Sequence, residues 1–393
     1  MRILYITLEN LSFQKGSVTH IREIVDGLRS HGHDVGLAGC SWKKTEKDQK
    51  FYNLLHPVVS RFKWLIRKRT PYLLSSGILF LYLLKVLHRY DIIYARDYHT
   101  VLIALLPRLL FGKKLIFEMN GLASEEYRLR GKSIRNSIAA YLIQKAEKMA
   151  TRYSDRIVVV TPQIASYLRT HFRCQTEKME VVSNGVNTRK FSPVDNAELL
   201  AEWRRRIGIR KDEIVIAFVG NLAPWQGVES LIRVAPVVLS GMRNIRFLIV
   251  GDGKLKKGLE AEVARLGMVD HFIFTGMVDY KEIPFYINIS DVCVLLKQEL
   301  ASGYSPIKVY EYMACGKPVI ASRVAGLEFI ETEGVGRLVE PGNIISIEKG
   351  LSELLRDRQK RIHMGSKGLQ LVRERFDWES RVVKIGIILE GLA

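Results

Sequence analysis

Short apolar runs alternate along this chain with longer amphipathic stretches, and no other feature of the sequence constrains the fold as strongly. Such alternation is typical of a parallel sheet covered by helices, so we expect an α/β fold. A helix is expected over about 18–30. The expected strands are 3–7, 34–38, 92–94, 115–118 and 157–160 in the first half, and 214–219, 247–250, 272–274, 292–296 and 318–321 in the second.

Length predicts two domains. The chain has 393 residues, of which 47% are hydrophobic, whereas a single core rarely serves more than roughly 250 to 300 residues. Residues 192–213 are polar and charged, and we expect a short helix there but no long apolar strand. We therefore expect a first wound sheet within 1–192 and a second within 193–375.

Glycines follow several strands of the second half. Gly220, Gly251, Gly253 and Gly276 stand where expected strands end, and open α/β sheets bind ligands at the carboxyl ends of their strands. Glycine also ends strands for steric reasons alone. The glycines therefore indicate an edge of the sheet rather than a particular ligand.

The stretch SPIKVYEYMACGKPVIAS, residues 305–322, predicts one helix and a strand after it. Ser305 is a good N-cap, Pro306 suits the first helical position, and Gly316 with Pro318 ends the helix. A helix N-terminus attracts anions, and Lys308 adds a full charge in the same turn. Glu311 projects from the same side of the helix and can accept hydrogen bonds from ribose hydroxyls. The alternative is an exposed Lys–Glu pair that contributes little.

Composition excludes several other classes of protein. The four cysteines form no CxxC pair, which argues against a disulfide framework and a zinc site and favours a reducing compartment. The N-terminus indicates a buried strand rather than a signal peptide. The apolar segment 72–84 is too short to span a bilayer, which needs about 20 residues. No Asp-x-Asp pair lies in the expected phosphate loops, so we expect no required metal or other cofactor.

Positive charge is concentrated in the first half of the chain. Residues 1–193 hold 32 Lys and Arg against 15 Asp and Glu, and residues 194–393 are almost neutral. The segment RFKWLIRKR, with Phe62 among its aromatic residues, suits an anionic membrane surface; a solvent-exposed helix face is the alternative. Nucleic acid is less favoured because no known binding motif accompanies the charge. The residues expected at the membrane are Arg61, Lys63, Trp64, Arg67, Lys68 and Arg69.

Six stretches in this order resemble family 4 of the retaining, nucleotide-sugar-dependent glycosyltransferases: KGSVTHIREIVDGLRSHGHDV, VVSNGVNTRKFSP, FVGNLAPWQGVESLI, FLIVGDGKLKKGLE, FTGMV and SPIKVYEYMACGKPVIAS. The resemblance covers nearly the whole chain and is closest to a branch with SPxK before the second glutamate of the family motif. It implies a GT-B fold, in which two Rossmann-like domains face each other across a cleft. The acceptor is then expected on the first domain and the donor on the second, with a last helix over about 376–393 that returns to the first domain.

On the donor side, the resemblance assigns the ribose to Glu311. The family's first glutamate is replaced by Gly303, with Glu299 four residues upstream, and its loop arginine and lysine are replaced by Asn221 and Gln226. Lys308 therefore becomes the expected cation for the diphosphate. The remaining residues expected to contact the donor are Gly220, Gly251, Met277, Val278, Tyr304, Ser305, Pro306 and Ile307.

On the acceptor side, Lys15, Gly16 and Ser17 resemble the family's flexible glycine loop, and His20 opens the helix behind it. His20 is equally well explained as a helix-start residue. Asn120 stands where many relatives have a histidine close to the reacting sugar; a turn residue in an Asn-Gly pair is the alternative. Further candidates for this side are Glu118 and Arg96, each at the end of an expected strand.

Together these features predict a glycosyltransferase, of hexosyl or N-acetylhexosaminyl type, that retains the anomeric configuration. We expect Lys308, Glu311 and Asn120 to carry catalysis, mainly by stabilising the departing diphosphate. The expected donor is a nucleotide sugar, a UDP-sugar before others, and the expected acceptor is lipid-linked or a polysaccharide at the cytoplasmic face of the plasma membrane. The alternatives are a catalytically degenerate member that binds nucleotide sugar or lipid, and a sugar-nucleotide epimerase on the same fold.

Overall fold

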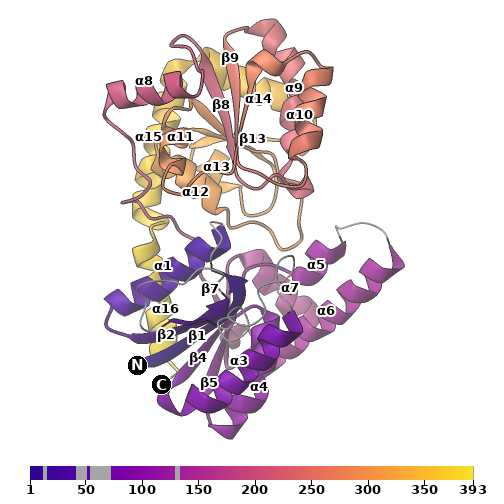
Figure 1. Ribbon diagram of the computed structural model, residues 1–393, viewed down its shortest axis with the longest axis vertical. Coiled ribbons are helices and arrows are strands. Elements are labelled where there is room, and N and C mark those ends of the chain that lie inside the picture. Colours follow the sequence, from indigo (N-terminus) through magenta and orange to yellow (C-terminus); the bar gives the residue numbers. More distant parts are fainter. Residues whose placement is uncertain (12–15, 41–50, 54–71, 129–132, 393) are drawn as a thin grey trace, which may run out of the picture. The chain divides into compact units, whose positions relative to one another are not determined.

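The computed structural model describes residues 1–11, 16–40, 51–53, 72–128 and 133–392. The chain divides into two compact units, each described here by itself (Figure 1). Unit 1 comprises Met1–Asn184 and Trp378–Ala393, and unit 2 comprises Gly185–Asp377. The sequence predicts the first change of domain at 192/193, and the structure has it at 184/185. The predicted membrane residues Arg61, Lys63, Trp64, Arg67, Lys68 and Arg69 lie outside the described residues.

Unit 1 contains, in its described part, a parallel seven-stranded sheet in the order β3-β2-β1-β4-β5-β6-β7. Its strands are β1 (Arg2–Asn10), β2 (Asp34–Cys40), β3 (Phe51–Asn53), β4 (Ile92–Arg96), β5 (Lys114–Met119), β6 (Arg156–Val159) and β7 (Met179–Val181). Its helices are α1 (Gly16–Ser30), α3 (Tyr72–Val86), α4 (Tyr98–Leu110), α5 (Ala123–Arg128), α6 (Ile134–Tyr153), α7 (Pro162–Phe172) and α16 (Trp378–Glu390).

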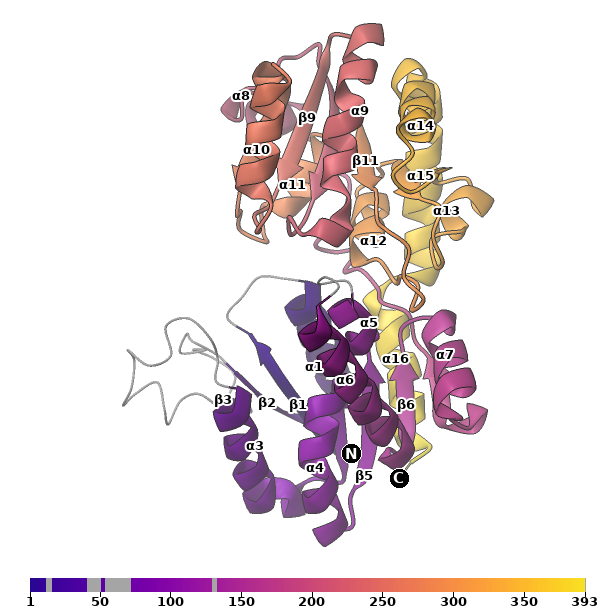
Figure 2. The same ribbon diagram turned by 90° about the vertical axis from the view of Figure 1, so that its right-hand side faces the viewer.

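Helices cover both faces of this sheet (Figure 2), and an apolar cluster is buried on each face. Helices α3, α4 and α7 pack on one face, with Leu83, Val101 and Leu168 among the buried side chains. Helices α1 and α16 pack on the other face, where Gly27 of α1 leaves room for Val382 of α16. The last helix therefore completes the core of unit 1, although the chain of unit 2 precedes it.

Unit 2 contains a parallel six-stranded sheet in the order β10-β9-β8-β11-β12-β13. Its strands are β8 (Ile214–Val219), β9 (Ile245–Val250), β10 (Phe272–Gly276), β11 (Val292–Leu295), β12 (Val319–Ser322) and β13 (Gly336–Val339). Its helices are α8 (Ala197–Arg206), α9 (Val228–Gly241), α10 (Lys256–Arg265), α11 (Ile283–Asn288), α12 (Ile307–Ala314), α13 (Phe329–Thr332), α14 (Ile344–Arg356) and α15 (Arg358–Arg375).

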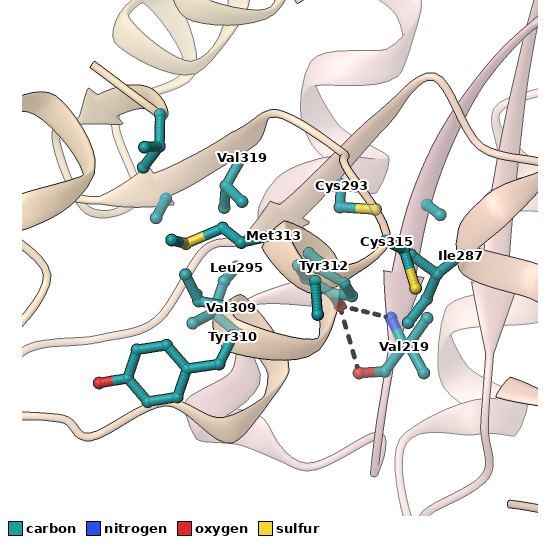
Figure 3. Packing of buried hydrophobic residues seen from close by; sticks show 14 of the residues in the cluster. Val219, Ile287, Cys293, Leu295, Val309, Tyr310, Tyr312, Met313, Cys315 and Val319 are labelled. Carbon is teal, nitrogen blue, oxygen red and sulfur yellow. Dashed lines mark hydrogen bonds between the residues drawn. The ribbon is translucent and has the colours of Figure 1, made fainter. Parts of the chain in front are cut away.

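Helix α12 is fixed to strand β8 by a buried tyrosine (Figure 3). The Tyr312 hydroxyl accepts a hydrogen bond from the backbone N–H of Val219 at 3.0 Å and donates one to its carbonyl at 3.4 Å. Val309, Met313 and Ala314 add apolar contacts in the same core cluster. Because these contacts hold the helix against the end of a central strand, they also fix the opposite, polar side of α12.

The predicted α/β fold with two wound parallel sheets is confirmed, and every expected strand overlaps an observed one. Strands β3, β7 and β13 are not predicted, whereas α8 is the short helix expected within the polar connection 192–213. The four cysteines are free thiols. In the described ranges, no helix is long and apolar enough to cross a bilayer.

Candidate active site

The loops after the central strands of unit 2 meet at the carboxyl edge of the sheet. Gly220, which follows β8, donates its N–H to the Val250 carbonyl at 2.8 Å, and Gly251, which follows β9, donates to the Gly276 carbonyl at 3.1 Å. A third bond, from Leu222 N–H to the Asp252 carbonyl at 2.9 Å, joins the first two loops further out. These backbone hydrogen bonds therefore fix the positions of the loops at the edge of the sheet that the glycines of the sequence indicate.

Helix α12 begins at this edge one residue later than predicted. Pro306, not Ser305, occupies the N-cap, with an extended backbone at φ −87° and ψ 97°, and no side chain caps the first turn. The prediction of Ser305 as N-cap is wrong because Pro306 keeps this non-helical conformation and Ile307 becomes the first helical residue. The end of the helix before Gly316 is as predicted.

Lys308 lies over the Gly220 loop. Its Nζ is 3.5 Å from Oε1 of Gln226, to which it donates, and 5.7 Å from the centre of the Phe218 ring. A Cβ atom at position 220 would lie 2.1 Å from Cε of Lys308, so a larger residue here would displace the end of the lysine side chain. Burial lowers the pKa of Lys308 to about 8, and the nearby Glu311 carboxylate opposes this shift.

Glu311 lies one turn further along α12 and is 5% exposed. The hydroxyl of Tyr280 donates to its Oε1 at 3.2 Å. Burial raises the pKa of Glu311 to about 7, although Lys308 and the Tyr280 hydroxyl favour the charged form. Glu311 is therefore buried and Lys308 half-buried, with pKa shifts of opposite direction, so the two do not form the exposed Lys–Glu pair that stood as the alternative. The sequence does not identify Tyr280, which follows the β10 loop and has no distinguishing neighbour.

The positions at which this chain departs from the family pattern differ in burial and in their contact with Lys308. Gln226 is buried and contacts Lys308 directly, whereas Asn221 is exposed. Gly303 is buried, with a left-handed φ of 61°, in a turn closed by its N–H and the Leu300 carbonyl at 3.0 Å. Glu299, the possible substitute for the missing glutamate, is exposed.

The other predicted donor residues differ in exposure. Met277 is 79% exposed, and Val278 packs partly against the core. Tyr304 is half-buried; its hydroxyl donates to the Gln298 carbonyl at 2.7 Å, and Lys297 lies 4.3 Å from its ring centre. Ser305 and Ile307 are half-buried beside the buried Pro306.

A second polar cluster is buried in unit 1 around Glu118, the next-to-last residue of β5. Its carboxylate accepts hydrogen bonds from the Tyr5 hydroxyl at 2.7 Å and from Nδ2 of Asn120 at 3.2 Å. It forms ion pairs with Nε2 of His20 and, at 3.7 Å, with the Arg96 guanidinium. The structure thus brings together four residues that the sequence nominates separately for the acceptor side.

His20 is a buried member of this cluster. Its Nδ1 lies 2.6 Å from Oδ1 of Asn184, and the Trp378 ring meets it edge-on at 5.1 Å. Both ring nitrogens of His20 therefore contact side chains of the protein. Gly16 is exposed and Ser17 half-buried in the first turn of α1, while Lys15 lies outside the described residues.

The charge state of the cluster follows from its contacts. Burial alone would raise the pKa of Glu118, but His20 and then Arg96 lower it to about 2, so the carboxylate stays ionised. The same ion pair and the Tyr5 hydroxyl raise the pKa of Arg96 despite burial. The sequence does not identify Tyr5, which reads as a core residue of β1; Asn184 does stand in an Asn-Gly pair after a strand.

In the described part of the chain, no group of three or more His, Cys, Asp or Glu side chains is arranged to hold a metal ion. The candidate catalytic groups lie in two polar clusters. Unit 2 contributes Lys308 and Glu311, and unit 1 contributes Glu118, His20 and Arg96 with Asn120.

Comparison with known proteins agrees with this geometry. Residues 201–370 match the model "Glycosyl transferases group 1", and residues 15–190 match "Glycosyltransferase Family 4". An uncharacterised glycosyltransferase of Methanocaldococcus jannaschii is 27% identical, over 93% of this chain and 91% of the relative. The D-inositol 3-phosphate glycosyltransferase of Kribbella flavida is 30% identical, over 74% of this chain and 68% of the relative.

Among solved structures, HepE of Anabaena in complex with UDP-glucose superposes with a TM-score of 0.76 at 18% identity, over the whole of both chains. A likeness at this level of identity supports the fold. Taken with the two family matches and the relatives, it shows that the chain belongs to the family 4 glycosyltransferases and that its two parallel-sheet units are the Rossmann-like domains of a GT-B enzyme.

Proposed function

We propose that this glycosyltransferase binds a nucleotide sugar, with a UDP-sugar as the first candidate, at the carboxyl edge of unit 2. The observation that carries the proposal is the half-buried Lys308 and the buried Glu311 on one side of α12, with Lys308 beside the Gly220 loop. It is supported by the solved structure of HepE in complex with UDP-glucose. The transferred sugar is proposed to be a hexose or an N-acetylhexosamine, with retention at its anomeric carbon.

In this proposal the diphosphate lies against the first turn of α12 and the Nζ of Lys308. The helix terminus and the ammonium group both favour an anion at this position. The ribose hydroxyls donate to Glu311, whose carboxylate Tyr280 holds in place. Gln226 takes a hydrogen bond from Lys308 without adding a competing charge, so the lysine remains available to the phosphates.

The acceptor is proposed to bind at the Glu118 cluster of unit 1. NH1 of Arg96 lies 3.7 Å from Oε1 of Glu118 and has no hydrogen-bond partner among the described residues, so it keeps a hydrogen-bond donor that an acceptor oxygen could use. Asn120 is half-buried and can offer an amide to a sugar hydroxyl or to the leaving phosphate. The name of the Kribbella relative supports an acceptor with polyol hydroxyls; for this chain we propose a lipid-linked or polysaccharide acceptor.

During transfer, the bond between the anomeric carbon and the β-phosphate oxygen breaks while the acceptor oxygen bonds to the same face. The acceptor hydroxyl proton passes to the departing phosphate, which keeps the charge balanced. The main catalytic contribution of the chain is then the cation at Lys308, because negative charge grows on the leaving group in the transition state. No metal or organic cofactor takes part in the proposed reaction.

The enzyme is proposed to act at the inner face of the plasma membrane as a peripheral cytoplasmic protein. The concentration of positive charge in residues 1–193 supports this location. The same membrane would present a lipid-linked acceptor.

A panel of radiolabelled nucleotide sugars, incubated with membrane extract and with wild type or Lys308→Ala, tests the function. We expect wild type to transfer label to lipid or polysaccharide, and the variant to lose turnover by at least tenfold with a smaller loss of donor affinity. Near-wild-type turnover of the variant would show that another cation stabilises the leaving group. Epimerised donor without transfer would favour the epimerase.

A degenerate, binding-only protein is the second candidate, because Gly303, Asn221 and Gln226 replace three charged residues of the family pattern. Saturable binding of UDP by wild type, with no transfer from any donor in the panel, would favour this candidate over the enzyme.

A further inference from the structure

Helix α6 of unit 1 exposes an apolar and basic surface. It has 20 residues, and Ile134 at its start is 81% exposed. Six large apolar side chains are exposed along its length: Ile134, Ile138, Tyr141, Leu142, Met149 and Tyr153. At 100° per residue they fall on one side of the helix. Because the stripe runs from the first turn to the last, it differs from the isolated exposed apolar residues that are normal on protein surfaces.

Four cations lie on the same exposed side of α6: Arg135, Lys145, Lys148 and Arg152. Nζ of Lys145 lies 5.2 Å from the centre of the Tyr141 ring, and the Arg152 guanidinium lies 5.8 Å from that of Tyr153. Basic side chains that lie along aromatic rings keep their charged ends at the margin of an apolar surface. This mixture suits the boundary between lipid headgroups and acyl chains.

The single acidic residue of α6 points away from this surface. Glu147 is buried, where its carboxylate accepts hydrogen bonds from the Ala123 N–H at 2.7 Å and the Ser124 hydroxyl at 2.6 Å. These bonds hold α5 against α6 (Figure 1). The exposed side of the helix is consequently positive, with no carboxylate of its own to neutralise it.

The helix is firmly attached to unit 1, so the exposed stripe is a surface of the folded protein. Ser133 caps its N-terminus by accepting from the Asn136 N–H at 3.1 Å, and Ala140 and Ala150 are buried. At its other end, the Arg108 guanidinium of α4 donates to the Tyr153 carbonyl at 2.6 Å. The last turns of α4 expose three further leucines, Leu106, Leu109 and Leu110.

The charge decides between two occupants of this surface. A second copy of the chain docked by two-fold symmetry would bring the four α6 cations of one copy against the same four of the other, and like charges repel. An anionic bilayer attracts all four cations and also accepts the apolar side chains. Charge complementarity therefore favours lipid.

We propose, building on the membrane location suggested for the function above, that the exposed side of α6 docks on an anionic lipid surface. The helix lies in the plane of the bilayer, with its apolar side chains in the acyl boundary and its four cations among the headgroups. None of the residues of this surface belongs to the basic segment 61–69, so the two sets of residues can be varied independently.

Flotation with vesicles tests the proposal on the full-length protein. The vesicles are phosphatidylcholine alone, or phosphatidylcholine mixed with phosphatidylglycerol. The charge variant carries Arg135→Gln, Lys145→Gln, Lys148→Gln and Arg152→Gln, and the apolar variant carries Ile138→Ser, Leu142→Ser and Met149→Ser. The matched control changes four exposed cations of unit 2 to glutamine: Lys349, Arg356, Arg358 and Arg373. A fourth variant changes the five cations of 61–69 to glutamine.

We expect wild type and the unit 2 control to bind the anionic vesicles, and the charge variant to bind roughly tenfold or more weakly. The apolar variant should lose the part of binding that survives high salt. Each variant should keep the wild-type thermal midpoint and UDP affinity, which separates lost docking from lost folding.

Three results would overturn the proposal: no binding of wild type to anionic vesicles, equal binding by the α6 variants, or a wild-type dimer in sedimentation velocity that the apolar variant abolishes. Loss of binding in the 61–69 variant alone would assign docking to that segment. Vesicle binding is measured without turnover, so its failure is distinguishable from failure of the proposed transferase reaction.

Discussion

Lys308 and Glu311 carry opposite charges at a site that is largely shielded from water. The pKa of each group is shifted in the direction that favours its neutral form. The pKa of Lys308 falls to about 8 and that of Glu311 rises to about 7 because burial disfavours both charges. Both groups are predominantly ionised only in the narrow interval between these values. A bound diphosphate would stabilise the ammonium form of Lys308, so donor binding and protonation at this site are linked.

We predict that UDP affinity falls as pH rises above about 8, by up to tenfold for each pH unit, because Lys308 must be protonated to attract the diphosphate. Calorimetric titration of wild type between neutral and alkaline pH measures this slope. The profile of Lys308→Met provides the control, since it retains any titration of UDP itself. Parallel profiles for the two proteins would contradict the role given to Lys308.

A second residue-scale prediction concerns the stability of Glu311→Gln without ligand. The folded pKa of about 7 exceeds the ordinary value of 4.5, so the folded state binds the Glu311 proton more tightly than the unfolded state does. This tighter binding stabilises the folded state fully below pH 4.5, and the stabilisation is lost as pH rises through 7. Over that window wild type should lose roughly 3 kcal/mol of unfolding free energy that the variant retains.

Thermal denaturation at acidic and mildly alkaline pH checks this prediction. Glu311→Gln should match wild type in acid and exceed it at alkaline pH, while binding UDP more weakly by roughly 1.5 to 3 kcal/mol. A variant that is less stable than wild type at every pH would mean that the Tyr280 hydrogen bond outweighs the cost of burying the charge.

At the scale of elements, the loop between β11 and α12 holds Gly303, which stands at the position of a family glutamate, in a left-handed conformation. Gly303 has a φ of 61°, which a residue with a Cβ adopts only under strain. We predict that Gly303→Glu lowers the unfolding free energy by roughly 1 to 2 kcal/mol. Gly303→Asn, which tolerates the left-handed region better, serves as control in the same denaturant titration. Equal stability of wild type and the glutamate variant would show that the loop rearranges freely.

The contact between α1 and α16 gives a second element-scale prediction. A Cβ at Gly27 would lie 2.4 Å from Cγ2 of Val382. Although alanine normally favours a helix over glycine, Gly27→Ala should therefore destabilise the protein by roughly 1 to 3 kcal/mol.

The double variant Gly27→Ala with Val382→Ala tests this steric origin. It should recover part of the loss, so that a double-mutant cycle in urea yields a coupling of roughly 1 kcal/mol or more. Strict additivity of the two single changes would exclude the clash as the cause.

The sequence predicts the buried central strands well because each is a short, continuous apolar run between longer amphipathic stretches. It does not predict β3, β7 or β13, which are short and lie at or near sheet edges, where few apolar residues are needed. The helix start at Ser305 is wrong by one residue because cap chemistry alone does not determine the backbone of Pro306.

The candidate site was predictable where function depends on residues near in sequence, as for Lys308 and Glu311 one turn apart. It was not predictable where partners come from distant strands. Tyr5 and Glu118 are 113 positions apart and meet because β1, β4 and β5 are neighbours in the sheet. Tyr280 reaches Glu311 across 31 positions, from the connection that follows β10 to helix α12. A single sequence predicts which segments form strands, but it does not show which distant residues meet in the folded protein.

At the scale of the whole molecule, two separate cores predict two unfolding transitions with different pH dependence. The folded pKa of Glu118, about 2, lies below the ordinary 4.5, so unit 1 is fully stabilised by this group above 4.5 and loses roughly 3 kcal/mol as pH falls through 2. Unit 2 contains Glu311, whose contribution has the opposite sign.

Scanning calorimetry should therefore show one transition that falls between about pH 4.5 and 2, and one that rises when UDP is added. Glu118→Gln should lower the first transition near neutral pH and flatten its acid dependence, because His20 and Arg96 lose their counter-charge. A single transition that responds both to UDP and to this substitution would contradict independent units.

The placement of α16 also sets an order of events during synthesis. Unit 2 is contiguous from Gly185 to Asp377, so it can fold as soon as that segment has left the ribosome. Unit 1 lacks Trp378 and the apolar side of α16 until residues 378–390 have also left the ribosome, and α1 remains uncovered on that face for the whole interval. A nascent chain arrested before residue 378 should therefore contain a folded unit 2 and an incomplete unit 1 that chaperones can bind.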